Sequence, residues 1–158
     1  MGKTVASRLH LRFIDTDELI IQHTGFTIGE NLARLGDDRF MQLEEQVVLG
    51  LGNFDNCVVS PGGSVVYSRP AMDFLKKRSV VIFLHVPLEV IADRVGPQRG
   101  VVKLRDRTLQ DLYNERLPLY EKYAHKRIFA NRDVRLVAEE IEGMIKIMEN
   151  EHGSDPRS

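Results

Sequence analysis

The sequence is poor in cysteine, tryptophan and long apolar runs. Its 158 residues include one cysteine, Cys57, and no tryptophan. A single cysteine cannot form an internal disulfide, so we interpret Cys57, which adjoins Val58 and Val59, as a small buried hydrophobe in a reducing compartment. The longest apolar run, residues 80–84, is far too short to cross a bilayer.

Net charge is also nearly absent. A formal charge of −1 gives no electrostatic reason to expect a nucleic acid or an anionic membrane as partner. The N-terminal residues lack the apolar region of a signal peptide, and Ala6 stands where a myristoylation motif has Ser or Thr. The five histidines form no metal-ligand pair at a useful spacing. We therefore expect a cytoplasmic monomer.

The length and the 42% hydrophobic content are typical of one globular domain spanning residues 1–158. Strands and helices alternate along the chain, which predicts an α/β fold with a parallel sheet. We expect strands at residues 12–14, 57–60, 80–86 and 128–130. We expect helices at residues 4–11, 17–52 with breaks at Gly25 and Gly36, 87–95, 109–124 with a bend near Pro118, and from 134 onward. Thr27 and Glu30 predict a capping box, residues 96–107 a mobile loop and residues 150–158 a disordered tail.

Ligands of parallel sheets bind beyond the carboxyl ends of the strands, here after Ile14, Ser60 and Val86. Asp15 and Asp17 follow the first of these ends. Because residues i and i+2 of an extended segment share a side, both carboxylates can face one cleft, one near Mg²⁺ and one at a substrate hydroxyl. The alternative is that Asp17 caps the next helix and Asp15 is solvated.

A glycine turn follows the second predicted strand end. In Pro61-Gly62-Gly63-Ser64, the missing Cβ atoms let the backbone approach a ligand closely. A simple tight turn explains the same residues equally well.

Two arginines are candidates for anion binding. Arg99 lies in the predicted loop at residues 96–107, where a closing arginine would neutralise phosphate charge, although charge-rich loops are usually only solvated. Arg116 lies among apolar residues of a predicted helix, which makes it a candidate bidentate clamp for a carboxylate. A structural ion pair with Glu115 or Glu121 is the alternative.

Gly2-Lys3-Thr4 matches the last three positions of the phosphate-binding loop G-x-x-x-x-G-K-[ST]. Together with later segments in the same order, it resembles the shikimate kinase family, which are P-loop kinases related to adenylate kinase. The matching segments are Gly2-Lys3-Thr4, Phe13–Ile20, Gly25–Ile28, Phe40–Glu44, Pro61–Ser64, the strand ending at Val86-Pro87, the loop around Arg99, and Glu115–Tyr120.

This resemblance implies a three-layer P-loop kinase sandwich with a parallel sheet, a helical substrate-binding region at residues 17–52 and a lid loop at residues 96–107. It implies ATP- and Mg²⁺-dependent phosphorylation of a small hydroxy acid, namely shikimate to 3-phosphoshikimate in aromatic amino-acid biosynthesis. By the same resemblance, Gly2, Lys3, Thr4 and Arg99 would bind ATP, and Thr4 and, through water, Asp15 would bind the metal. Asp17 would act as the base, assisted by Lys3 and Arg99. The substrate would be bound by Asp17, Gly62, Gly63 and Arg116.

Several departures from the family pattern leave alternatives open. The first central strand and the front half of the phosphate loop are missing from this sequence, and the spacing from Lys3 to Asp15 is shorter by more than a helical turn, so we expect an N-terminally truncated chain. Met41 replaces a substrate-binding arginine, and Pro61 replaces the first glycine of the turn. Loss of one charge-assisted contact costs about 1.5–3 kcal/mol, or about tenfold or more in affinity. A homoserine kinase and a catalytically inactive remnant therefore remain alternatives.

Overall fold

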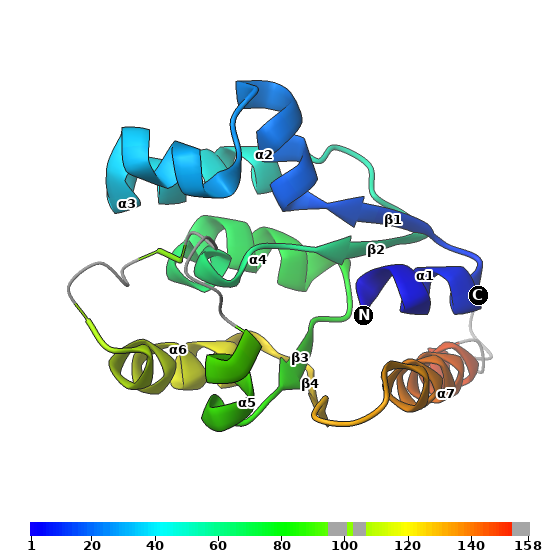
Figure 1. The fold of residues 1–158 in the computed structure, drawn as a ribbon. Coiled ribbons are helices and arrows are strands. Elements are labelled where there is room, and N and C mark those ends of the chain that lie inside the picture. Colours follow the sequence, from blue (N-terminus) through cyan, green and yellow to red (C-terminus); the bar gives the residue numbers. More distant parts are fainter. Residues whose placement is uncertain (95–100, 103–106, 153–158) are drawn as a thin grey trace.

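The computed structural model describes residues 1–94, 101–102 and 107–152 (Figure 1). The elements in chain order are α1 (Gly2–Leu9), β1 (Arg12–Asp15), α2 (Thr16–Thr24), α3 (Ile28–Leu49), β2 (Cys57–Ser60), the 3₁₀ helix η1 (Gly63–Tyr67), α4 (Arg69–Arg78), β3 (Ile82–His85), α5 (Leu88–Arg94), α6 (Leu109–Tyr123), β4 (Lys126–Phe129) and α7 (Val134–His152). The predicted alternation of strands and helices is confirmed.

The strands form two parallel pairs. β1 pairs with β2 in a register that sets Asp15 opposite Ser60, and β3 pairs with β4 so that His85 lies opposite Phe129. Among the described residues, no further strand pairs with β2 or β3. All four strands are parallel to their partners, as predicted, but the sheet is divided between β2 and β3.

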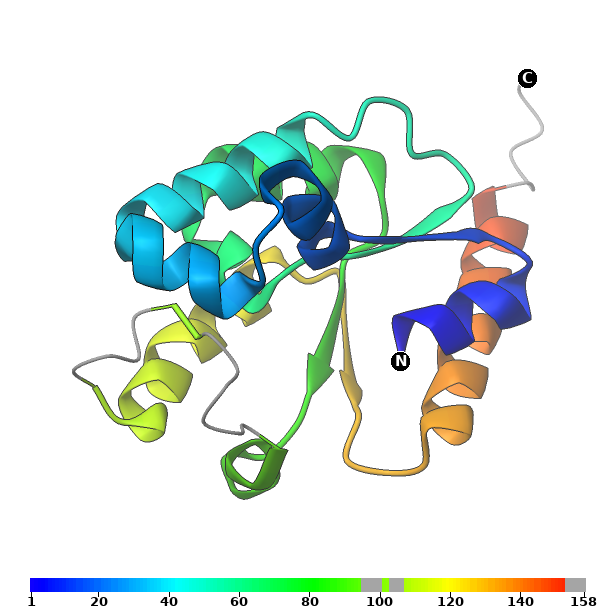
Figure 2. The ribbon, with the colours of Figure 1, turned by 45° about the horizontal axis from the view of Figure 1, so that its top comes forward.

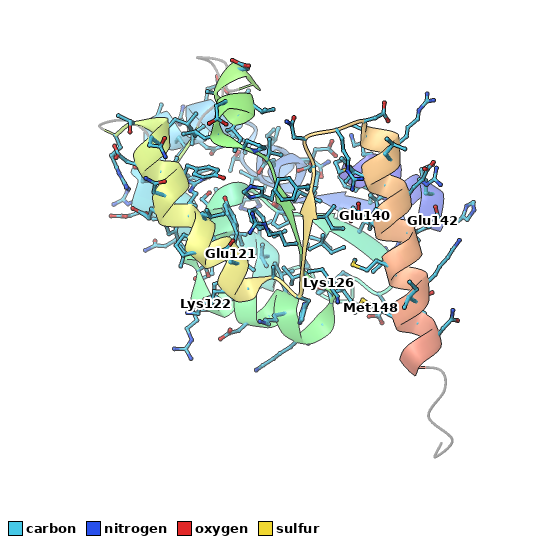
Figure 3. All side chains as sticks on the ribbon, turned by 90° about the horizontal axis from the view of Figure 1, so that it is seen from below. Glu121, Lys122, Lys126, Glu140, Glu142 and Met148 are labelled. Carbon is cyan, nitrogen blue, oxygen red and sulfur yellow. The ribbon has the colours of Figure 1, made fainter. Side chains whose placement is uncertain are left out.

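Helices cover both faces of the strands. One core contains Val65 and Val66 of η1, apolar residues of α4 and Tyr123 of α6. The other core joins Val5 of α1 to α7 and β4. Adjacent residues of β2 point to opposite faces, because Val59 packs on the first core and Val58 on the second. Figure 3 shows the same division around β4, with Glu121 on α6 and Glu142 on α7 lying on either side.

The helical region between β1 and β2 has a small core of its own. Ile20 of α2 and Phe40 of α3 are fully buried there together with Val102. The predicted capping box is confirmed, since Thr27 and Glu30 bond reciprocally at the start of α3. Gly25 ends α2 with φ of +76°, and Gly36 interrupts α3 with φ of +73°, so both predicted breaks are present.

Three local predictions were incomplete. Helix α4 was not predicted, although Ser68 caps it and Pro70 occupies its first turn. Strand β3 spans Ile82–His85 and is shorter than the predicted 80–86. Helix α7 continues to His152, past the predicted start of a tail at residue 150, while residues 153–158 lie outside the described part. Within the described residues, no helix has the length and apolar character needed to cross a membrane.

The divided sheet predicts uneven hydrogen exchange. β2 and β3 each have an edge without a strand partner among the described residues, and N–H groups along a strand alternate between its two edges. We expect the open-edge amides of β2 and β3 to exchange at least about tenfold faster than the paired amides of the same strands. Exchange followed by NMR, with the interior amides of α7 as the protected reference, measures this. Equal protection on both edges would contradict the division.

Candidate active site

The carboxyl ends of β1 and β2 lie side by side. Asp15 and Ser60 are opposite one another in the strand register. The N–H of Gly62 donates to the Oγ1 of Thr16 at 3.2 Å, and Thr16 is buried. This bond ties the glycine turn to the start of α2, so two of the three predicted strand ends form one site. Thr16 was not predicted as part of it.

Asp15 and Asp17 lie at the junction between β1 and α2. β1 ends at Asp15 and α2 begins at Thr16, so the two acids do not share one extended segment. Asp15 caps α2, because its Oδ1 accepts from the N–H of Asp17 at 3.0 Å. The alternative in which Asp17 is the cap and Asp15 is solvated is therefore wrong. Asp17 lies in the first turn of α2, where the helix dipole favours its negative charge.

Two carboxyl groups meet the backbone of Gly62. A Cβ atom added to Gly62 would lie 3.1 Å from Oδ1 of Asp17 and still closer to Oε1 of Glu44. The backbone of Gly62 has φ of −61° and ψ of 153°, which any residue can adopt, so only the lack of space requires glycine here. The close approach at this turn is therefore made by the protein's own carboxyl groups.

Glu44 is a buried acid that sequence reasoning missed as a site residue. It lies on α3, it is 4% exposed, and it accepts a hydrogen bond from the Ser64 hydroxyl. Burial raises the pKa of Glu44 to about 7; the Ser64 bond opposes the shift, the charge of Asp17 adds to it and Arg116 opposes it. The sequence held a signal, because Phe40, Glu44 and Val48 recur every four residues and all three are buried. An acid in an apolar stripe indicates a specific role.

Helix α6 closes the other side of the turn. The hydroxyl of Tyr120 donates to the carbonyl oxygen of Gly63 at 2.9 Å. A Cβ atom on Gly63 would lie 3.0 Å from that hydroxyl oxygen and 3.3 Å from Nη1 of Arg116. The Tyr120 ring stacks on Phe83, with 5.0 Å between the ring centroids, while its hydroxyl fixes the turn.

Arg116 is half-buried and held in a defined orientation. Its Nε donates to the Tyr67 hydroxyl oxygen at 3.2 Å, and its Nη2 donates to the Val102 carbonyl at 3.0 Å. The guanidinium also lies over the Tyr67 ring, 5.3 Å from its centroid. These contacts place the guanidinium beside the glycine turn, and neither Tyr67 nor Val102 was expected to orient it.

The two acids proposed as alternative partners of Arg116 have other cations beside them. Glu115 pairs with Arg107 at 2.6 Å, and Glu121 pairs with Arg127 at 2.8 Å. The ion pair with Glu115 also raises the already high pKa of Arg107. Arg116 itself is oriented by its hydrogen bonds to Tyr67 and Val102.

Lys3 approaches this site from α1. Its Nζ is 3.1 Å from Oε1 of Glu18, in the first turn of α2 directly after Asp17, and both side chains are more than half exposed. The N-terminal end of α1 points toward the strands (Figures 1 and 2). The pair with Glu18 therefore places the Lys3 amine beside the first turn of α2.

Gly2, Thr4 and Arg99 are the other residues predicted to bind phosphate or metal. Gly2 lies against Phe13, because an added Cβ would be 2.5 Å from Cε2 of that ring, and Thr4 is half-buried in the first turn of α1. Arg99 lies outside the described residues. In the part of the chain that the structure describes, no three His, Cys, Asp or Glu side chains are grouped to hold a metal ion.

Comparison with known proteins gives a consistent result. A family model described as shikimate kinase matches residues 1–146. A shikimate kinase of Clostridium botulinum (strain Alaska E43 / Type E3) is 33% identical over 146 residues, which cover 92% of this chain and 88% of the relative. A shikimate kinase of Caldanaerobacter subterraneus subsp. tengcongensis is 30% identical, covering 89% of this chain and 85% of the relative.

Solved structures are similar over the same extent. Shikimate kinase from Acinetobacter baumannii in complex with shikimate aligns with a TM-score of 0.83 at 30% identity, covering 91% of this chain and 83% of that one. Shikimate kinase from Aquifex aeolicus aligns with a TM-score of 0.79 at 26% identity, covering 92% and 87%.

The crowding at Gly62 predicts a large cost for one methyl group. In Gly62→Ala, the Cβ displaces the carboxyl groups of Glu44 and Asp17, and we expect the free energy of unfolding to fall by about 1–3 kcal/mol. Gly143→Ala is the matched control, since an added Cβ meets open space in α7 and should raise stability by up to about 1 kcal/mol. Urea denaturation measures both. Equal stability of the two variants would contradict the crowding.

Proposed function

The chain belongs to the shikimate kinase family, and from this premise we propose that it transfers the γ-phosphoryl group of ATP to a hydroxyl group of shikimate. The product is 3-phosphoshikimate, an intermediate of aromatic amino-acid biosynthesis. The observation that carries the proposal is the glycine turn after β2, which has Asp17 on one side and the guanidinium of Arg116 on the other. A hydroxyl and a carboxylate of one small molecule are the groups that this pair would bind.

On the substrate side, Asp17 holds the reacting hydroxyl and accepts its proton as the oxygen forms a bond to phosphorus. Arg116 binds the substrate carboxylate, and its bonds to Tyr67 and Val102 support this role because they orient the guanidinium before substrate arrives. Gly62 and Gly63 let the backbone approach the ring of the substrate. Positioning and charge neutralisation provide most of the rate in phosphoryl transfer, so this arrangement suits the reaction.

On the phosphate side, members of this family use ATP and Mg²⁺. The Lys3 amine is 70% exposed, which leaves it accessible to phosphate oxygens, and Gly2 and Thr4 flank it on the first turn of α1. Thr4 and, through water, Asp15 would hold Mg²⁺. A nucleotide-bound Mg²⁺ takes most of its ligands from phosphates and water, so one hydroxyl and one carboxylate suffice. Bound MgATP supplies the phosphoryl group and neutralises its charge.

Lys3 and Arg99 complete the proposed machinery. Lys3 would stabilise the negative charge on the phosphoryl oxygens, exchanging its exposed pair with Glu18, which is worth at most about 1 kcal/mol, for a phosphate contact. Arg99, as a lid arginine, would act on the same phosphates. Both roles rest on the match to the family motif and remain proposals.

One observation favours a second substrate. The family usually has an arginine at the position of Met41, and here the Met41 side chain packs on the apolar cluster of Ile20 and Phe40. Nearby Arg39 is exposed. With one arginine fewer for the carboxylate, a smaller hydroxy acid such as homoserine is the second candidate.

Turnover of the purified protein with MgATP separates these candidates. We expect phosphorylation of shikimate, detected by coupled release of ADP and by mass spectrometry of the product. Phosphorylation of homoserine alone would overturn the substrate assignment. Absence of turnover with either hydroxy acid would favour the inactive alternative.

Substitution of Asp17 tests the proposed base. Because Asp17→Asn keeps the shape of the side chain but cannot accept the proton, we expect kcat to fall by about 10²–10⁴-fold with nearly unchanged ATP affinity. Asp55→Asn is the control, because Asp55 precedes β2 and lies at the end of that strand opposite to the glycine turn. Retained turnover in Asp17→Asn would show that another group is the base.

A further inference from the structure

We propose that Glu44 is a positioning residue that takes up a proton when the anionic substrate binds, so that substrate affinity falls as Glu44 ionises. The proposal rests on the proposed function, because it takes the substrate to be a carboxylate bound at Arg116. It adds a residue that none of the sequence motifs assigned to the reaction.

The Glu44 carboxyl group lies against the glycine turn. One carboxyl oxygen accepts from the buried Ser64 hydroxyl at the start of η1, and the other lies against Gly62. The Gly62 N–H is in turn bonded to Thr16. Glu44 therefore supports both sides of the turn that is proposed to contact substrate, without itself needing to reach the reacting atoms.

Charged groups of both signs surround the Glu44 carboxyl group. Asp17 faces it from α2, and Arg116 and Tyr120 face it from α6. Ser64, from η1, is a neutral donor, and α3 itself contributes Met41 one turn earlier. Among these neighbours the negative charge of Asp17 and the positive charge of Arg116 oppose one another, while burial disfavours the ionised form of Glu44. Its pKa of about 7 follows from that balance.

Binding of an anionic substrate would change the charges around Glu44. A carboxylate that binds Arg116 neutralises the cation that favours ionised Glu44, and it adds a further negative charge nearby. Bound substrate therefore raises the pKa of Glu44 above its value in the free protein. By linkage, substrate binding takes up a proton wherever free Glu44 is ionised, that is, at pH values above about 7. Below that range Glu44 is already neutral and binding should be independent of its titration.

The hydrogen bond from Ser64 persists when Glu44 is protonated. A neutral carboxyl group still accepts the Ser64 hydroxyl, so the turn stays supported while the second negative charge beside Asp17 disappears. Glutamine has the same shape and can accept the same bond without ever ionising. Glu44→Gln should thus reproduce the binding-competent form at every pH.

Calorimetric titration of shikimate into the nucleotide-free protein tests the coupling. Titrations between about pH 5.5 and about pH 8.5, each in two buffers with different ionisation enthalpies, give the number of protons taken up. For the wild-type chain we expect no uptake at the acid end, and affinity that falls by up to about tenfold per pH unit above neutrality. Glu44→Gln should show no uptake and a flat profile. Glu45→Gln, whose carboxyl group instead accepts from Ser68 at 2.5 Å, should behave like wild type.

Turnover provides a second readout. The fall in affinity should appear in KM for shikimate, with kcat unaffected by Glu44→Gln. Glu44→Ala removes the acceptor of the Ser64 bond and should weaken shikimate binding at all pH values, a defect that glutamine rescues.

Two results would overturn the inference in distinguishable ways. Binding of shikimate with equal proton uptake in wild type and Glu44→Gln, or with no uptake in either, would remove the role of Glu44 and leave the proposed function intact. Failure of the folded wild-type chain to bind shikimate at any pH would overturn the proposed function and this inference together.

Discussion

Burial of the Glu44 carboxyl group imposes the strictest constraint on this site. A buried polar group without a hydrogen bond costs about 1–3 kcal/mol on the basis of protein mutational data, so the acid must find a donor and suppress its charge. The Ser64 hydroxyl provides the donor, and that bond fixes the start of η1 against α3. Gly62 is fixed with it, because only a residue without a side chain fits beside Glu44 and Asp17. The shape of the turn after β2 follows from this packing.

The fold brings to that turn groups that are distant in sequence. Parallel pairing sets the ends of β1 and β2 together, which places Asp17 and the turn side by side. Helix α6 packs across the first core, so Arg116 and Tyr120 reach the opposite side of the turn. The separate core of α2 and α3 includes Val102, whose carbonyl oxygen accepts from Arg116. The Arg116 guanidinium is thus connected to the helical region through one backbone group.

The features of this arrangement that depend on local sequence could be predicted, whereas contacts between residues distant in sequence could not. The breaks at Gly25 and Gly36 and the capping box depend on neighbouring residues and are confirmed. The carboxyl ends of the strands lie within one residue of the predicted positions. The hydrogen bond from Ser64 to Glu44 spans twenty residues, and the bond from Tyr120 to Gly63 spans fifty-seven. Such pairings exist only after the elements pack. Which of the two acids caps α2 could not be predicted, because one residue decides where β1 ends and α2 begins.

The central claim is that one small molecule bridges Asp17 and Arg116 across the glycine turn. A crystal structure of this chain with bound shikimate tests it most directly. We expect the substrate carboxylate in bidentate contact with the Arg116 guanidinium and a substrate hydroxyl within hydrogen-bond distance of the Asp17 carboxylate. Shikimate bound elsewhere, or bound at the turn with its carboxylate directed away from Arg116, would contradict the account.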